Sequence, residues 1–90
     1  MPEENLKKNL ARRAILLQLQ AAYPAAVSDE ILMQGLKICG VNFSEKQFAQ
    51  DVEYLCELGL ARRVPSLISA GLKRAKLTAR GIEFLESEGF

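Results

Sequence analysis

Apolar residues recur at helical spacing over the first quarter of the chain. The segment from Leu6 to Ala22 contains no Gly or Pro, so we expect one amphipathic helix there, ending at Tyr23 before Pro24. One face of this helix carries two leucines and two alanines: Leu10, Ala14, Leu17 and Ala21. Ile15 and Leu19 lie almost opposite. We expect the first stripe to face the core and the opposite pair to meet a second surface, either the last helix of the same subunit or another subunit.

Local capping signals predict a short helix after this one. A short strand over 25–27 leads to Ser28, whose hydroxyl can cap a helix with Asp29 and Glu30 in its first turn. The expected buried stripe of this helix comprises Ile31, Leu32, Leu36 and Cys39. Gly40 predicts the helix end, because glycine readily adopts the left-handed conformation found there.

The next helix has the strongest local signal in the chain. Ser44 and Gln47 have the spacing of a capping box, and Phe43 is placed to pack against Phe48 or its neighbour at the fourth helical position. The expected inner face comprises Phe48, Val52, Leu55 and Cys56. Gly59 predicts the end of this helix.

Beyond Gly59 the hydrophobic period becomes roughly two residues, which is typical of strands. Residues 60–64 and 72–77 therefore predict a hairpin around a loop at 65–71. Since the loop begins with proline and ends with glycine, it separates the two strands clearly.

A last helix completes the predicted fold. Thr78 can cap it, with Ile82 and Leu85 facing inward and Phe84 beside them. The predicted architecture is α+β, in the order helix, short strand, helix, helix, hairpin, helix. It forms one domain over residues 1–90, with about residues 1–5 and 88–90 frayed.

Composition narrows the range of functions. The 90 residues are 49% hydrophobic and 26% charged with a net charge of +1, which is typical of a soluble globular domain. The chain has no histidine, the commonest general base and a frequent metal ligand, and Cys39 and Cys56 lack the spacing of a metal or redox motif. We expect both cysteines in the core, and no enzymatic activity, metal or cofactor. No signal or membrane-spanning segment is expected, so the predicted location is the cytoplasm.

The positive charges are unevenly distributed along the chain. Between residues 58 and 82 there are six basic residues and no acidic ones: Arg62, Arg63, Lys73, Arg74, Lys76 and Arg80. We expect them to form one cationic patch that holds phosphate groups. The alternative is a charged hairpin that merely discourages edge-to-edge strand pairing.

Three stretches in this order resemble the winged helix-turn-helix domain: residues 44–48, residues 52–60 and residues 75–81. The second is similar to the exit from recognition helix to wing in arsenical-repressor-like and multidrug-repressor-like families. The third is similar to their Leu-Thr-x-x-Gly entry into the closing helix. The chain resembles most closely the small winged-helix proteins of Mu-like prophages. The resemblance implies a phage-type regulator of transcription, without a ligand domain, in the cytoplasm of a bacterial host cell.

The resemblance also implies which residues meet double-stranded DNA. The helix beginning after Ser44 would be the recognition helix, and its contacts with bases and nearby phosphates would come from Ser44, Lys46, Gln47, Gln50 and Tyr54. The flanking backbone would be held by Arg62, Arg63, Lys73, Arg74 and Lys76. A homodimer is expected through Ile15, Leu19 and Phe84.

The predicted recognition helix is acidic, which argues for an alternative function. It carries Lys46 against Glu45, Asp51, Glu53 and Glu57, an unfavourable balance beside phosphates. The alternative is a protein-interaction module that does not bind DNA. Such a module would dock its partner through this acidic helix or through Leu67 and Ile68 in the hairpin loop.

Overall fold

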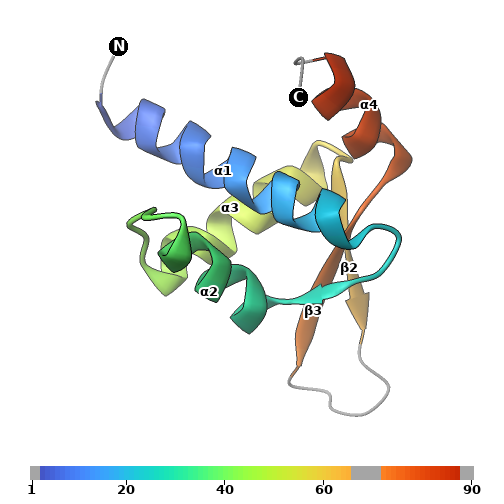
Figure 1. Ribbon diagram of the computed structural model, residues 1–90, viewed down its shortest axis with the longest axis horizontal. Coiled ribbons are helices and arrows are strands. Elements are labelled where there is room, and N and C mark those ends of the chain that lie inside the picture. Colours follow the sequence, from blue (N-terminus) through green and yellow to red (C-terminus); the bar gives the residue numbers. More distant parts are fainter. Residues whose placement is uncertain (1–2, 66–71, 88–90) are drawn as a thin grey trace.

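Four helices and a three-stranded antiparallel sheet make up the described part of the chain, residues 3–65 and 72–87 of the computed structural model (Figure 1). The elements follow one another as α1 (Glu3–Ala22), β1 (Val27–Ser28), α2 (Asp29–Ile38), α3 (Glu45–Glu57), β2 (Ala61–Pro65), β3 (Lys73–Leu77) and α4 (Ala79–Ser87). The predicted α+β class and element order are therefore confirmed. Helix α1 begins three residues earlier than the periodicity indicated, and residues 1–2 and 88–90 lie outside the description.

Helix α1 buries the face opposite to the one we expected. Its core residues are at most 3% exposed: Ala11, Ile15, Leu16 and Leu19. Leu10 and Leu17, from the predicted inner stripe, are 50% and 38% exposed. The physical reason is size, since Ile15, Leu16 and Leu19 remove more apolar surface from water than two leucines and two alanines would.

This reversal changes the predicted dimer contacts. Ile15 and Leu19 are both 0% exposed inside the subunit, so their assignment to a subunit interface is wrong. They belong to the central cluster that also holds residues of α2, α3, the sheet and α4. Phe84, the third residue of that prediction, is 38% exposed on α4.

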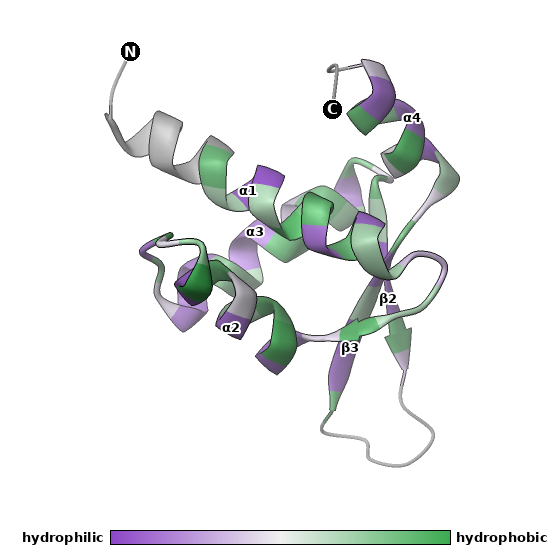
Figure 2. Ribbon diagram, viewed as in Figure 1, coloured by the Kyte–Doolittle hydropathy of each residue, from purple (hydrophilic) through white to green (hydrophobic). Residues whose placement is uncertain are grey.

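Helix α2 is capped as expected but is buried on a narrower face. The Ser28 hydroxyl accepts a hydrogen bond from the Ile31 amide at 3.3 Å, and Gly40 ends the helix region with a φ of +79°. Leu32 and Leu36 are fully buried. Ile31 is 58% exposed and Cys39 is also exposed, so their predicted burial is wrong. Helix α2 packs on α1, and its ribbon carries both hydrophobic and hydrophilic segments (Figure 2).

Helix α3 follows the prediction closely. The Ser44 hydroxyl accepts a hydrogen bond from the Gln47 amide at 3.1 Å, and the rings of Phe43 and Phe48 lie 6.1 Å apart. The predicted inner face is buried at Phe48, Val52 and Leu55, while Cys56 is half-buried against the core. Gly59, with a φ of +80°, then turns the chain toward the sheet.

The sheet has the strand order β1-β3-β2, so β3 is central. Ala61 pairs with Leu77 and Arg63 with Ala75. The side chains of Ala61, Ala75 and Leu77 are buried, which makes their side the inner face of the sheet. The hairpin of β2 and β3 projects away from the helices (Figure 1). The predicted loop residues Leu67 and Ile68 lie outside the described residues.

Two stretches that are distant in sequence meet at the start of α4. The Thr78 hydroxyl donates to the Gly59 carbonyl at 2.6 Å and accepts from the Gly81 amide at 3.0 Å, so it caps α4 as predicted. The Thr78 amide donates to the Leu60 carbonyl at 3.1 Å. Gly81 packs against that same carbonyl so closely that a Cβ atom would collide with it. The exit from α3 and the entry into α4 are thereby held together.

Candidate nucleic-acid interface

Three cationic side chains share the outer face of the hairpin. Side chains alternate between the two faces of a strand, and Ala61, Ala75 and Leu77 define the inner one. Arg62 is paired across the strands with Lys76, and Arg74 lies two residues along the central strand from Lys76. We call Arg62, Arg74 and Lys76 the outer-face triad.

The outer-face triad has no compensating carboxylate among the described residues. Arg74 is half-buried and donates to the Pro65 carbonyl at 3.5 Å, a long contact with a neutral group. Like charges directly opposite each other on a sheet are destabilising, because their side chains lie about 5 Å apart. This face of the hairpin therefore concentrates positive charge at a cost to stability.

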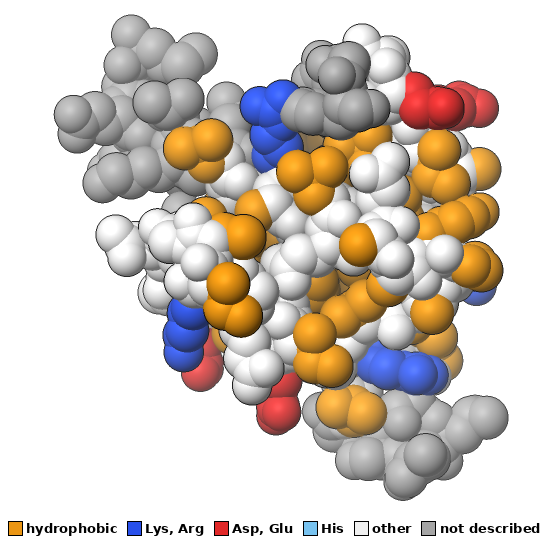
Figure 3. Space-filling model, in the orientation of Figure 1, with side chains coloured by type: hydrophobic (Ala, Val, Ile, Leu, Met, Phe, Trp, Pro, Cys, Tyr) orange, Lys and Arg blue, Asp and Glu red, His pale blue; other side chains and the backbone are white. Residues whose placement is uncertain are grey.

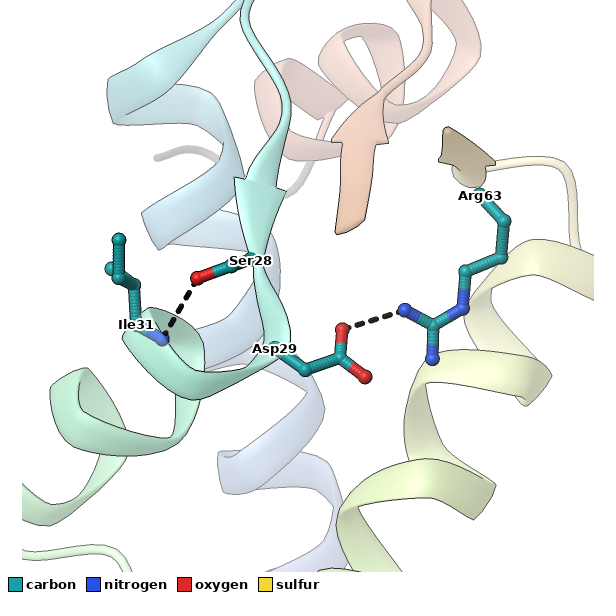
Figure 4. A network of polar contacts seen from close by, with 4 residues as sticks. All are labelled: Ser28, Asp29, Ile31 and Arg63. Atoms are coloured by element: carbon teal, nitrogen blue, oxygen red, sulfur yellow. Dashed lines mark hydrogen bonds and ion pairs between the residues drawn. The ribbon is translucent and has the colours of Figure 1, made fainter. Parts of the chain in front are cut away.

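Arg63 and Lys73 point to the other side of the same hairpin. The Arg63 Nη1 atom lies 2.6 Å from Asp29 Oδ1, and Asp29 stands in the first turn of α2 beside the capping Ser28 (Figure 4). The charge of Arg63 is thus compensated by an ion pair that joins β2 to α2. Lys73 is exposed, and by the alternation of side chains along β3 it lies on the same side of the strand as Ala75. The expectation of a single cationic patch is wrong for these two residues.

Arg80, the sixth basic residue of this stretch, belongs to α4 and not to the hairpin. Its Cδ atom lies close to Gly59, at 3.5 Å from the position a Cβ atom would occupy there. Arg80 therefore covers the exit from α3 and is separate from the outer-face triad.

The exposed ridge of α3 divides into a polar and an acidic half. Lys46, Gln50, Glu53 and Glu57 are all exposed, at the spacing of one helix face. Lys46 and Gln50 occupy the N-terminal half and the two glutamates the C-terminal half. Ser44 is exposed but its hydroxyl serves as the N-cap, and Gln47 is only half-exposed. The structure therefore leaves Lys46 and Gln50 as the polar side chains best placed to reach a ligand.

A cluster between α1 and α3 involves Tyr54 and was not predicted. The Arg12 Nε atom lies 3.2 Å from Asp51 Oδ1, and the Arg12 guanidinium stacks over the Tyr54 ring at 4.0 Å. Asp51 is 3% exposed, so its charge does not contribute to the outer surface of α3. Tyr54 is 41% exposed with one ring face covered by Arg12, which makes it part of a helix-to-helix contact.

Long sequence separation explains why both ion pairs were missed. Arg63 is 34 residues from Asp29, and Arg12 is 39 residues from Asp51. No local pattern marks either pair, since each depends on how α1, α2 and the hairpin are arranged in space.

The described residues offer little reactive chemistry. They contain no group of three or more potential metal ligands. Burial raises the pKa of the Cys56 thiol above its ordinary value, against a smaller opposite effect of Arg63. This thiol stays protonated at neutral pH and is a poor nucleophile. Among the described helices, none has the length and apolar character needed to cross a membrane.

Comparison with known proteins provides no relative for the chain. No protein-family model, curated protein or solved structure gives a significant match.

Proposed function

We propose that this chain is a small winged-helix protein that binds double-stranded DNA, attaching to the phosphate backbone through the outer-face triad. Lys46 and Gln50, in the N-terminal half of α3, contact bases or nearby phosphates. The proposed role is that of a phage-type transcription regulator, without a cofactor and without catalytic activity. The element order and the hairpin that projects beyond the helices support the winged-helix assignment.

The observation that carries the proposal is the position of Arg74 on the central strand, where it is paired on both sides. Arginines on β2 alone would be explained by protection of an edge strand, because charged edges discourage pairing between molecules. At Arg74, strand β3 is paired on both sides, with Ser28 of β1 and Val64 of β2. Edge protection therefore gives no reason for a cation at Arg74, whereas a polyanion that neutralises the triad does.

The polar and acidic halves of the exposed ridge of α3 are arranged as DNA binding through the N-terminal half of this helix would require. In helix-turn-helix proteins the N-terminal residues of the recognition helix contact the base edges. Gln50 can form paired hydrogen bonds with adenine, and Lys46 can reach guanine or a phosphate. The repulsive carboxylates of Glu53 and Glu57 lie in the other half of the exposed ridge. Because Asp51 is buried beside Arg12, α3 repels phosphates less than its sequence indicates.

Salt dependence tests the proposal directly. Fluorescence anisotropy with a labelled random-sequence duplex measures the affinity between about 50 and 200 mM salt. Three phosphate contacts give a slope of log affinity on log salt near −2.7, or roughly a 40-fold loss across that range. Replacing Arg62, Arg74 and Lys76 together by Gln should abolish most of this slope. Lys37→Gln, at an exposed position in the last turn of α2, is the matched control and should leave it unchanged.

Two results would overturn the proposal: an affinity that does not change with salt, or a slope that survives the triple substitution. Persistent lack of DNA binding together with capture of a basic protein would favour the alternative function. In that case Glu53 and Glu57 would form the docking surface, and replacing both by Gln would abolish the interaction.

A further inference from the structure

A buried ion pair joins α1 to α3, the helix whose exposed ridge is proposed to contact bases. The Arg12 Nε atom lies 3.2 Å from Asp51 Oδ1, and Asp51 is 3% exposed. Among the residues that the structure describes, Asp51 is the one charged side chain that is buried. A buried ion pair contributes little net stability, because taking two charges out of water costs about as much as their attraction returns. Stability alone therefore does not explain why this pair lies between the two helices.

Arg12 holds α3 at two points about one turn apart. Besides the contact with Asp51, the Arg12 guanidinium stacks over the Tyr54 ring, 4.0 Å from its centroid. Tyr54 follows Asp51 by three residues, so the two contacts are about 4.5 Å apart along the helix axis. A single contact would let α3 turn or slide about that point, whereas two contacts oppose both movements.

The apolar contacts of α1 define its angle less sharply. Ile15, Leu16 and Leu19 are buried in the central cluster, but apolar attraction has no direction. Helix α1 also carries apolar residues on its outward side, where Leu10 is 50% and Leu17 is 38% exposed. Figure 3 shows hydrophobic side chains spread over the face on which α1 lies in front. Since a small rotation between α1 and α3 would still bury apolar surface, the polar contacts are the ones that require a fixed angle.

We propose that Arg12 and Asp51 are positioning residues for α3, which set the angle at which Lys46 and Gln50 meet the bases of DNA. This inference rests on the proposed DNA binding. Gln50 immediately precedes Asp51, so a turn of α3 about its axis moves both through the same angle. A turn of about 20° displaces a side chain at a radius of about 5.5 Å by about 2 Å. Paired hydrogen bonds to a base edge do not survive such a displacement.

The proposal predicts that two components of DNA binding separate. The outer-face triad lies on the hairpin and attaches to phosphates, so its contribution should not depend on the angle of α3. Loss of the Arg12–Asp51 pair should therefore reduce sequence discrimination and leave the salt slope unchanged. A pair that only stabilised the fold would leave discrimination as it is once the protein is folded.

The test replaces the pair by apolar side chains, Arg12→Met together with Asp51→Leu, so that no single charge is left in the interior. The probes are a duplex selected from a random pool by the wild-type chain, and the random pool itself. Fluorescence anisotropy should show the ratio of the two affinities falling at least about tenfold, as expected for the loss of one or more base contacts. The salt slope on the random pool should not change. If circular dichroism shows that the double variant does not fold, Asp51→Asn keeps the shape of the side chain and should lower the ratio in the same direction.

Ile15→Val is the matched control, because Ile15 is fully buried on the same helix. This variant lowers stability by removing a methyl group from the core but leaves the ion pair intact. The ratio of affinities should therefore equal that of the wild-type chain. An equal fall in Ile15→Val and in the double variant would show a general loss of stability and would overturn the proposal.

Residual dipolar couplings of backbone amides measure the orientation of α1 and α3 without DNA. The couplings of both helices should agree between the wild-type chain and Ile15→Val, whereas in the double variant those of α3 should change relative to those of α1. Unchanged couplings in the folded double variant would overturn the proposal, and so would changed couplings with an unchanged ratio of affinities. A wild-type chain that binds no duplex would refute the proposed function instead, and the couplings would still decide whether the pair fixes the angle of α3.

Discussion

The junction between α3 and α4 makes Gly81 the position where one added methyl group should be most harmful. A Cβ atom at residue 81 would collide with the Leu60 carbonyl and would lie 2.6 Å from Leu77 Cδ1. The carbonyl is backbone, and it already accepts the Thr78 amide hydrogen bond at 3.1 Å. Relief therefore requires α4 to move by about 1 Å relative to the end of α3, an overpacking that costs up to about 3 kcal/mol.

Gly35 provides the control for the same substitution. Alanine at either helical position gains up to about 1 kcal/mol of helix propensity. At Gly35 the added methyl meets only the end of the Gln18 side chain, which can swing away at the loss of its 3.1 Å hydrogen bond to the Leu32 carbonyl. That loss is about 1 kcal/mol, so the two effects nearly cancel.

We expect Gly81→Ala to lower the free energy of unfolding by about 2 kcal/mol and Gly35→Ala to change it by less than about 1 kcal/mol. For a domain of this size, the first corresponds to a Tm lower by roughly 10 °C. Urea and thermal unfolding followed by circular dichroism measure both. Equal stability of the two variants would refute the close-approach argument.

Three further outcomes follow from local contacts. Ser44→Ala should lower the free energy of unfolding by about 1 kcal/mol in urea titrations, because the Gln47 amide loses its cap. A double-mutant cycle between Arg63→Gln and Asp29→Asn should give a coupling free energy below about 1 kcal/mol, since the Arg63 side chain is 37% exposed. Arg63→Gln should also leave the salt slope of DNA binding unchanged, because Asp29 already compensates this charge. Burial raises the pKa of the Cys56 thiol, so this thiol ionises at lower pH in the unfolded chain than in the folded one. The free energy of unfolding should therefore fall as the pH rises above about 8.5. In Cys56→Ala, the part of this fall that is due to the thiol should be absent.

Features encoded within a few residues could be predicted from the sequence. The caps at Ser28, Ser44 and Thr78, and the glycines that end α2 and α3, depend on neighbouring side chains and backbone conformation alone. These caps and glycines predicted where the helices begin and end, and hence the order of the elements. These predictions were correct because a helix cap depends only on hydrogen bonds between residues about one helical turn apart.

The choice of face on α1 could not be read in the same way. Two apolar stripes on one helix have the same periodicity, so the period alone does not select between them; the larger stripe fills the space left by α2, α3 and the sheet. That space accommodates Ile15, Leu16 and Leu19, which leaves the Leu10 stripe outside.

The prediction of a single cationic patch on the hairpin was wrong for a related reason. Alternation alone would have separated Arg62 from Arg63, but the side to which each belongs depends on strand register. A slip of one residue exchanges the faces, and the sequence does not fix the register across a loop of several residues. In the structure, Ala61 pairs with Leu77, and this register places Arg62 on the outer face and Arg63 on the side of Asp29.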